Sequence, residues 1–458
     1  MPNQTISSWL QELTLAHRRE KTFRKEASRI VSLYEGQKRE DSPFNILFSN
    51  TQTLAPALYN SPPRPVVRPR LKKPDAAASA GARLVTSVLE FLVDDGLGGS
   101  PAFDDLMASA VLEALVPGRG ITRFKYEAKI TSDAQELPEE DGAEPPVSES
   151  LEAEEICGEE VPWDRFLHGY AKKWDSVPWV AFLHYMDTEE LEEHFPGKTI
   201  PLSPTEQEPD RSNEGQSEER ADVETAPVYE IWDKGTKTVL FVSPNFPEGF
   251  LRPPIDDPFG LTGFFPCPAP LSFFQKISTL TPVPLYHFYE TQAKELNEVT
   301  TRINRLVRAM KIRGFYDSTV AGMERLMESG DNTLLPAENV AAMIAQGQTL
   351  EKSIWFFPIE KLVAVLQQLY LQRNQIKQVI YEITGIADII RGQSQASETA
   401  TAQQIKGQYA GLRLNSMKNG VNQFATELLR LKAQIICAKY DPQTILKISA
   451  ADQLSDQD

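Results

Sequence analysis

Long helical periodicity fills the last third of this chain. Over residues 285–312 apolar side chains recur every three or four positions, which predicts an amphipathic helix that packs on other helices. The same spacing predicts a second helix over 359–384 and a third over 399–440, with a kink near Gly411 and Gly420. The expected apolar positions are Tyr289, Ala293, Leu296, Val299, Ile303, Leu306 and Met310 in the first helix, Leu362, Leu366, Leu369, Ile376, Val379 and Ile383 in the second, and Ile405, Tyr409, Leu412, Val421, Phe424, Leu428, Leu431 and Ile435 in the third.

Two connecting segments differ in character from these helices. Residues 313–358 are rich in glycine and polar turns, and we expect a small module between the first two helices. Residues 385–398 are mostly small and polar and cannot anchor a core.

The part of the chain before residue 285 mixes short helices with strands. Helical patterns cover 76–92 and 101–115, and the second stops at Val116-Pro117-Gly118. Strand patterns cover 120–131 and 178–186, and residues 227–243 predict a hairpin around a polar turn. The fold class expected for the whole chain is therefore α+β.

Two acidic segments interrupt this part of the chain. Residues 133–160 hold twelve acidic residues and no basic one, and residues 203–226 hold eight acidic residues and two arginines. Both predict mobile surface loops. Neither has the spaced Asp, Asn and Gly of a calcium loop, so we expect no metal site there.

The charge of the chain is divided unevenly. The total is -17, yet residues 1–73 carry 13 basic and 6 acidic residues, a net of +7 that leaves -24 for the rest. One basic cluster lies on a probable helix at positions 17–25, and the other, Arg64, Arg68, Arg70, Lys72 and Lys73, lies in an extended segment broken by prolines. Either cluster could balance acidic neighbours in a fold or an assembly, or bind phosphate.

Several classes of protein are disfavoured. Cys157, Cys267 and Cys437 are isolated, which argues against a disulfide framework or a zinc site. No run of about 18 to 20 uninterrupted apolar residues predicts a membrane span. No phosphate-binding loop, dinucleotide fingerprint or hydrolase motif is present, so we expect neither an enzyme nor a cofactor.

The order of these elements resembles the portal proteins of tailed bacteriophages. The resemblance lies in NILFSNTQTLAPALYNSPPRPVVRPR at 45–70, VYEIWDK at 228–234, PFGLTGFFPCPAPL at 258–271, YETQAKELNEVTTRINRL at 289–306 and GIADIIRGQSQASETATAQQIKGQYAGLRL at 385–414. It covers most of residues 40–440, and it lies in the order of the pieces rather than in any one of them.

The resemblance implies a portal-like fold with named parts. Residues 1–284 would form a mixed α/β wing, 285–312 and 359–384 a two-helix stem, and 313–358 a small α/β clip. Residues 385–398 would form the tunnel loop and 399–440 a long kinked wing helix. Residues 441–458 would be a short remnant of the crown domain or a tail.

The resemblance also implies site residues. The tunnel loop would present Gln393, Ser394, Gln395, Ser397, Glu398, Thr399 and Thr401 to DNA in a channel. Arg302, Arg305, Arg308 and Lys311 of the stem would face either DNA or a neighbouring subunit, and Glu298 could pair with Arg302 one helical turn away. The clip residues expected to dock a motor or adaptor are Tyr316, Asp317, Glu324, Arg325, Glu328 and Asp331.

The implied role is that of a ring at one capsid vertex. About twelve identical subunits would surround double-stranded DNA during packaging and ejection. The expected partners are the large subunit of terminase, head-completion and tail adaptor proteins, and the major capsid and scaffolding proteins, with no membrane. The ring would assemble in the host cytoplasm and remain in the virion. The alternative is a non-enzymatic virion or cytoplasmic adaptor that does not contact DNA.

Overall fold

The computed structural model contains both helices and strands, in agreement with the expected α+β class. It describes residues 5–36, 43–70, 75–94, 101–134, 147–204, 224–310, 314–316, 354–356, 359–386 and 400–449. The chain forms two compact units. Unit 1 comprises Met1–Gln37, Asn45–Phe288 and Thr384–Asp458, and unit 2 comprises Lys38–Phe44 and Tyr289–Ile383.

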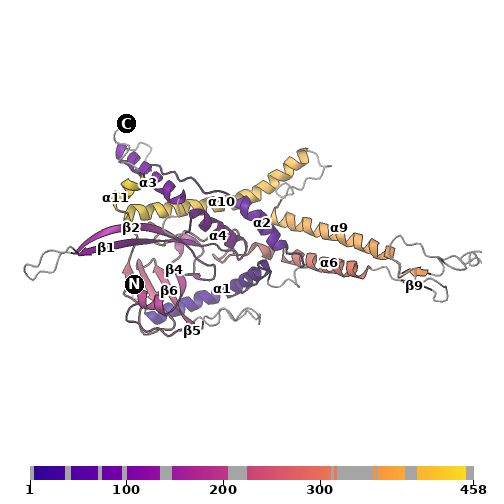
Figure 1. The fold of residues 1–458 in the computed structure, drawn as a ribbon, viewed down its shortest axis with the longest axis horizontal. Helices are drawn as coiled ribbons and strands as arrows, with labels where there is room; N and C mark the ends of the chain where they lie inside the picture. Colours follow the sequence, from indigo (N-terminus) through magenta and orange to yellow (C-terminus); the bar gives the residue numbers. More distant parts are fainter. Residues whose placement is uncertain are drawn as a thin grey trace, which may run out of the picture. The chain divides into compact units, whose positions relative to one another are not determined.

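Unit 1 contains helices before and after its strands, and one short helix between two of them (Figure 1). Its helices are α1 (Ile6–Tyr34), α2 (Ile46–Leu58), α3 (Ala76–Asp94), α4 (Phe103–Leu115), α5 (Thr188–His194), α10 (Ala400–Lys439) and α11 (Pro442–Ser449). Its strands are β1 (Thr122–Ala134), β2 (Val147–Glu160), β3 (Phe166–His168), β4 (Trp179–Met186), β5 (Ser203–Pro204), β6 (Glu224–Asp233), β7 (Thr238–Val242) and β8 (Ile255–Asp256). The predicted end of α4 is confirmed: Gly118 has a φ of 103°, which only glycine adopts at low cost.

An antiparallel sheet forms the centre of unit 1. Its strand order is β3-β4-β6-β7-β8, and β5 pairs with β6 at one end. The predicted hairpin of β6 and β7 is confirmed, with Tyr229 opposite Val242 and Asp233 opposite Thr238. Both faces of this sheet are buried, because alternate residues of each strand enter two separate hydrophobic clusters.

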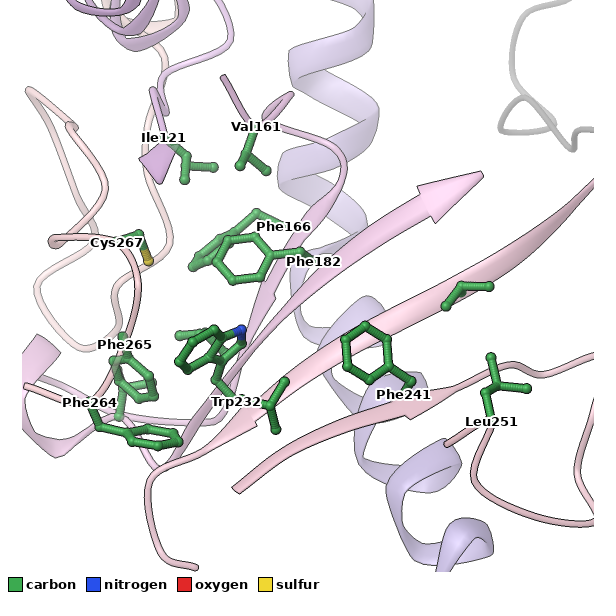
Figure 2. Packing of buried hydrophobic residues seen from close by; sticks show 14 of the residues in the cluster. Ile121, Val161, Phe166, Phe182, Trp232, Phe241, Leu251, Phe264, Phe265 and Cys267 are labelled. Atoms are coloured by element: carbon green, nitrogen blue, oxygen red, sulfur yellow. The ribbon is translucent and has the colours of Figure 1, made fainter. Parts of the chain in front are cut away.

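Different parts of the chain cover the two faces. On one face, Trp9, Leu13 and Ala16 of α1 pack against the sheet, and Trp9 meets Trp179 edge to face. On the other face, residues 251–267 return across the sheet, and Figure 2 shows Phe264 and Phe265 beside Trp232, with Cys267 nearer to Phe166. The sheet is thus the middle layer of unit 1.

A buried carboxylate holds α1 in place. Glu20 lies in the same helical stripe as Leu13 and Phe23, and both of its carboxylate oxygens accept hydrogen bonds from Arg119, at 2.7 and 3.0 Å. Arg24 also pairs with Glu20 and donates to the carbonyl oxygens of Asp164 and Phe166. Burial opposes the charge of Glu20, but the two arginines hold its pKa at about 2. The network therefore joins α1, the end of α4 and the start of β3.

A second buried arginine joins the two sheets of unit 1. Arg123 of β1 donates to Glu159 of β2 and to Glu230 of β6, each at 2.7 Å. Trp232 donates its indole N–H to the other oxygen of Glu230, also at 2.7 Å. The guanidinium group of Arg123 lies over the ring of Phe182, 4.4 Å from the ring centre. These contacts fix the β1–β2 hairpin against the sheet.

Helix α10 packs within unit 1 along the stripe that its spacing predicts. Val421, Phe424, Leu428, Leu431 and Ile435 are all buried. The ammonium group of Lys432 is also buried and donates to the carbonyl oxygen of Leu92 in α3 at 3.0 Å. The helix is continuous across Gly411 and Gly420. The earlier positions of its stripe, up to Leu412, lie outside the side chains that the structure describes.

Two expectations about unit 1 need correction. The prediction of a loop over residues 133–160 is wrong for the second half of that segment. Val147–Glu160 form β2, which pairs with β1 in antiparallel register. The acidic segment 203–226 is also wrong as a loop at its two ends, because Ser203–Pro204 form β5 and residues 224–226 belong to β6. Within the described ranges, α3 is long and apolar enough to cross a membrane by length and composition alone. Core helices pass the same test, and α3 packs against α4, α10 and α11.

The Glu20 network generates a first prediction. Glu20→Gln leaves two buried guanidinium groups without their counter-ion, so the free energy of unfolding should fall by about 3–5 kcal/mol. Urea unfolding followed by tryptophan fluorescence measures this change, because Trp9, Trp163 and Trp179 lie in unit 1. Glu12→Gln on the same helix is the matched control and should cost less than about 0.5 kcal/mol. Equal losses for both variants would contradict the assignment.

Glu113 generates a prediction about pH. Burial, together with the negative charges of Glu160 and Asp164, raises the pKa of Glu113 to about 8, against the opposing N–H of Trp163 and charge of Arg119. The folded chain therefore keeps a proton that the unfolded chain releases above its ordinary pKa of about 4.5, and stability should fall as pH rises from 4.5 to 8.

Glu113→Gln removes this contribution. The free energy of unfolding of the variant, relative to the original protein, should increase between pH 5 and pH 8.5 by roughly 1–3 kcal/mol. Denaturant titrations of both proteins at the two pH values measure this increase. The control is Glu127→Gln, at an exposed position of β1. A difference that does not change with pH would show that Glu113 ionises normally.

Candidate functional site

Unit 2 holds the residues expected to form the stem and part of the clip. Its described elements are α6 (Glu290–Ala309), β9 (Gly314–Tyr316), β10 (Ile354–Phe356) and α9 (Ile359–Thr384). Strands β9 and β10 pair in antiparallel register, with Gly314 opposite Phe356 and Tyr316 opposite Ile354. The chain thus leaves α6 through β9 and re-enters α9 through β10.

Helix α6 is amphipathic as predicted. Tyr289, Ala293, Leu296, Val299 and Ile303 are all buried. The helix is shorter than the expected 285–312, because Leu285–Phe288 form a 3-10 turn before it. Thr300 lies within the buried stripe and satisfies its hydroxyl by donating to the carbonyl oxygen of Leu296 at 2.7 Å.

The three described stem arginines lie on the exposed side of α6. At 100° per residue, Arg305 projects about opposite the centre of the buried stripe, and Arg302 and Arg308 lie about 60° to either side of it. All three side chains are exposed. Lys311 lies outside the described residues.

The ion pair between Glu298 and Arg302, one of the two alternatives for this arginine, does not form within the described chain. Both side chains are exposed, and among the described residues neither has a partner. The ion pair that α6 does form joins Glu290 to Lys294 at 2.8 Å, in the first turn of the helix. Over the described ranges, a single chain therefore leaves Arg302, Arg305 and Arg308 without an ion-pair partner.

Helix α9 has apolar side chains on two faces. Leu369, Ile376 and Ile380 are buried and share one stripe. Val363, Tyr370 and Leu371 lie about 100–200° away from that stripe around the helix and are 39%, 43% and 56% exposed. Val379, expected in the buried stripe, is also exposed, because Ile380 occupies that face. Three exposed polar side chains lie between Tyr370 and Leu371 around the helix, namely Gln367, Asn374 and Gln378. This second face is therefore mixed, and a packing partner could cover its exposed apolar side chains.

Phe44 contacts both long helices of unit 2, which its sequence context did not predict. Its ring lies under two cations of α9, 4.9 Å from the Arg373 guanidinium and 5.1 Å from the Lys377 ammonium group. Its backbone N–H donates to the side-chain oxygen of Asn297 in α6 at 3.2 Å. Phe44 thus contacts both long helices of unit 2, and Gln372 adds a hydrogen bond to Glu295 at 3.3 Å.

The structure describes only two of the remaining expected site residues. Of the clip residues, Tyr316 is the last residue of β9, whereas Asp317, Glu324, Arg325, Glu328 and Asp331 lie outside the described residues. Of the tunnel-loop residues, Thr401 is in the first turn of α10. Gln393, Ser394, Gln395, Ser397, Glu398 and Thr399 lie outside the described residues, and their role stays a prediction.

The described residues hold no group of three or more His, Cys, Asp or Glu side chains that could bind a metal ion. The perturbed carboxylates of unit 1 are paired with buried arginines or, in the case of Glu113, face other acids. The arrangement in unit 2 offers different properties, namely an exposed apolar face on α9 and an exposed cationic face on α6. Both are suited to binding rather than to covalent chemistry.

Comparison with known proteins does not assign the chain to a family. No protein-family model matches it, and no curated protein matches it at a significant level.

Proposed function

We propose that this chain is the subunit of a phage portal, a ring at one capsid vertex through which double-stranded DNA is packaged and ejected. The observation that carries the proposal is the second apolar face of α9, formed by Val363, Tyr370 and Leu371. In a ring, each copy of the chain would cover this face with a different surface of the next copy. Such a head-to-tail contact forms a closed ring when the rotation from one subunit to the next is a whole fraction of 360°.

The arrangement of unit 2 supports the same proposal. Two long helices flank a short antiparallel pair of strands, and a third long helix follows in the sequence, which is the order of stem, clip, stem and wing helix in the portal family. In the ring, β9, β10 and the residues between them would form the face that docks terminase and later the head-completion and tail proteins. Capsid and scaffolding proteins would contact the outer parts of the ring.

The charge of the chain fits a channel that DNA must leave. Each phosphate that a protein neutralises adds affinity through counterion release, so a strongly basic channel would hold the duplex. The chain carries -17 in total, which limits this effect. Arg302, Arg305 and Arg308 supply a local positive charge that either touches DNA or pairs with acids of the next subunit.

The mass of the purified protein in solution tests the ring directly. A closed ring of twelve 51.3 kDa chains would have a mass of about 616 kDa, measurable by light scattering, with a central hole in negative-stain images. Leu371→Asp places a charge on the apolar face of α9 and should reduce the ring to smaller species while the far-ultraviolet circular dichroism stays unchanged.

The matched control is Gln375→Asp, at an exposed polar position one turn further along α9. It should still form the ring. A protein that stays monomeric with scaffolding protein present would favour the adaptor that does not contact DNA. A ring that survives Leu371→Asp would show that a surface other than this face of α9 carries the contact between subunits.

The stem arginines provide a separate test of DNA contact. If they face the channel, replacing Arg302, Arg305 and Arg308 together with Gln should leave ring mass unchanged and lower the amount of DNA retained in filled heads by at least about tenfold. The corresponding triple Lys variant keeps the charge and should retain DNA. Loss of the ring itself in the Gln variant would instead assign these arginines to contacts between subunits.

A further inference from the structure

An unpaired extended segment of unit 1 carries three arginines on one side. Between α2 and α3, exposed and covered side chains alternate from Pro63 to Arg70, the two-residue period of a β-strand. The exposed positions are Arg64, Val66, Arg68 and Arg70, which we call the arginine ribbon. Val66 is 67% exposed although it is apolar.

The ribbon is held in place at two points. Five residues before it, Tyr59 at the end of α2 donates its hydroxyl to Asp104 of α4 at 2.7 Å. In its middle, the backbone N–H of Val67 donates to the hydroxyl of Thr86 in α3 at 3.1 Å, and that hydroxyl donates in turn to the carbonyl oxygen of Ala82. The extended conformation is therefore fixed before any partner arrives, which lowers the entropic cost of binding.

The prolines of this segment remove the N–H donors from one edge of the strand, whereas the other edge keeps its donors. In an extended chain the backbone groups of alternate residues point to opposite edges. Residues 63, 65 and 69 are prolines without an N–H, and the N–H of Val67 between them is already used. The N–H groups of Arg64, Val66, Arg68 and Arg70 point to the other edge, where no hydrogen bond to the described residues engages them.

The charge of the ribbon selects the partner. Among the described residues, Arg64, Arg68 and Arg70 have no ion pair or other partner. A strand paired along the open edge would place its side chains beside these arginines, where carboxylates would form charge-assisted pairs. Val66 lies between the arginines and would pack against an apolar side chain of that strand.

From this geometry we infer that the arginine ribbon binds an acidic, extended segment of a protein by adding it as a β-strand. A protein strand would accept hydrogen bonds from the free N–H groups, pack against the exposed valine and pair with the arginines. The phosphates of a nucleic acid would pair only with the arginines. This inference does not depend on the channel, because the ribbon belongs to unit 1 and every contact used above lies within that unit.

Binding of a labelled peptide tests the inference. The probe is an acetylated and amidated peptide of sequence Thr-Glu-Val-Glu-Val-Glu-Thr, and fluorescence anisotropy with the full chain measures its Kd. Binding should weaken by at least about tenfold in the variant with Arg64, Arg68 and Arg70 replaced by Gln. A peptide with Lys in place of Glu should not bind.

Two further measurements separate strand pairing from charge alone. Val66→Pro removes one N–H from the open edge without changing any charge and should weaken binding by about tenfold, whereas the matched Val66→Ile keeps both the N–H and the apolar side chain and should bind like the original protein. The acidic peptide with every Glu and Val N-methylated keeps its charge but cannot pair, and should not bind. This second measurement uses the unaltered protein, so it remains decisive if Val66→Pro disturbs the fold.

Three results would overturn the inference. The first is undiminished binding of the N-methylated peptide, because it would reduce the contact to charge. The second is equal binding of the acidic and lysine peptides. The third is tight, salt-dependent binding of a short DNA duplex to the same arginines with no binding of the acidic peptide, which would assign the ribbon to nucleic acid instead.

Discussion

The buried carboxylate of Glu20 is the interaction on which the rest of unit 1 depends. It stands in an apolar stripe of α1, where a charge is costly unless it is paired and hydrogen-bonded. Arg119 and Arg24 meet that requirement, and each also donates N–H groups of its guanidinium end to carbonyl oxygens of residues 163–166. Because these groups come from three separate parts of the chain, the network is complete only when α1 lies correctly on the sheet. A shift of α1 along the sheet would leave these buried charges unpaired, so the network also fixes the position of α1.

The two units use apolar surface in different ways. In unit 1 the central sheet is covered on both faces by its own chain, so its apolar side chains are satisfied within one molecule. In unit 2 the side of α9 that carries Tyr370 and Leu371 remains exposed. That contrast is the physical basis for expecting self-assembly through unit 2, while the arginine ribbon of unit 1 offers polar backbone groups to a partner of another kind.

Periodicity predicted most elements of this protein well. The stripes of α6 and the later part of α10, the β6–β7 hairpin and the stop of α4 at Gly118 all follow from local spacing and turn chemistry. The failures have identifiable causes. Strand β2 was hidden by its acidic residues, which are tolerated because some of them, such as Glu159, pair with basic residues of β1. For the basic cluster on α1, the alternative of charge balance within the fold is confirmed at Arg24, which is buried beside Glu20 and does not belong to a basic surface.

The sequence by itself determined the α+β class, the long helices, the separation of charge along the chain and the proline pattern of residues 62–70, because each depends on neighbours close in the sequence. Only the tertiary structure decided which charges are buried and which stay free. The partners of Glu20, Arg123 and Phe44 come from distant segments, and the exposure of Leu371 and of the arginine ribbon depends on what the rest of the chain covers. Local periodicity carries no information about those contacts, since they form only when separate elements pack together.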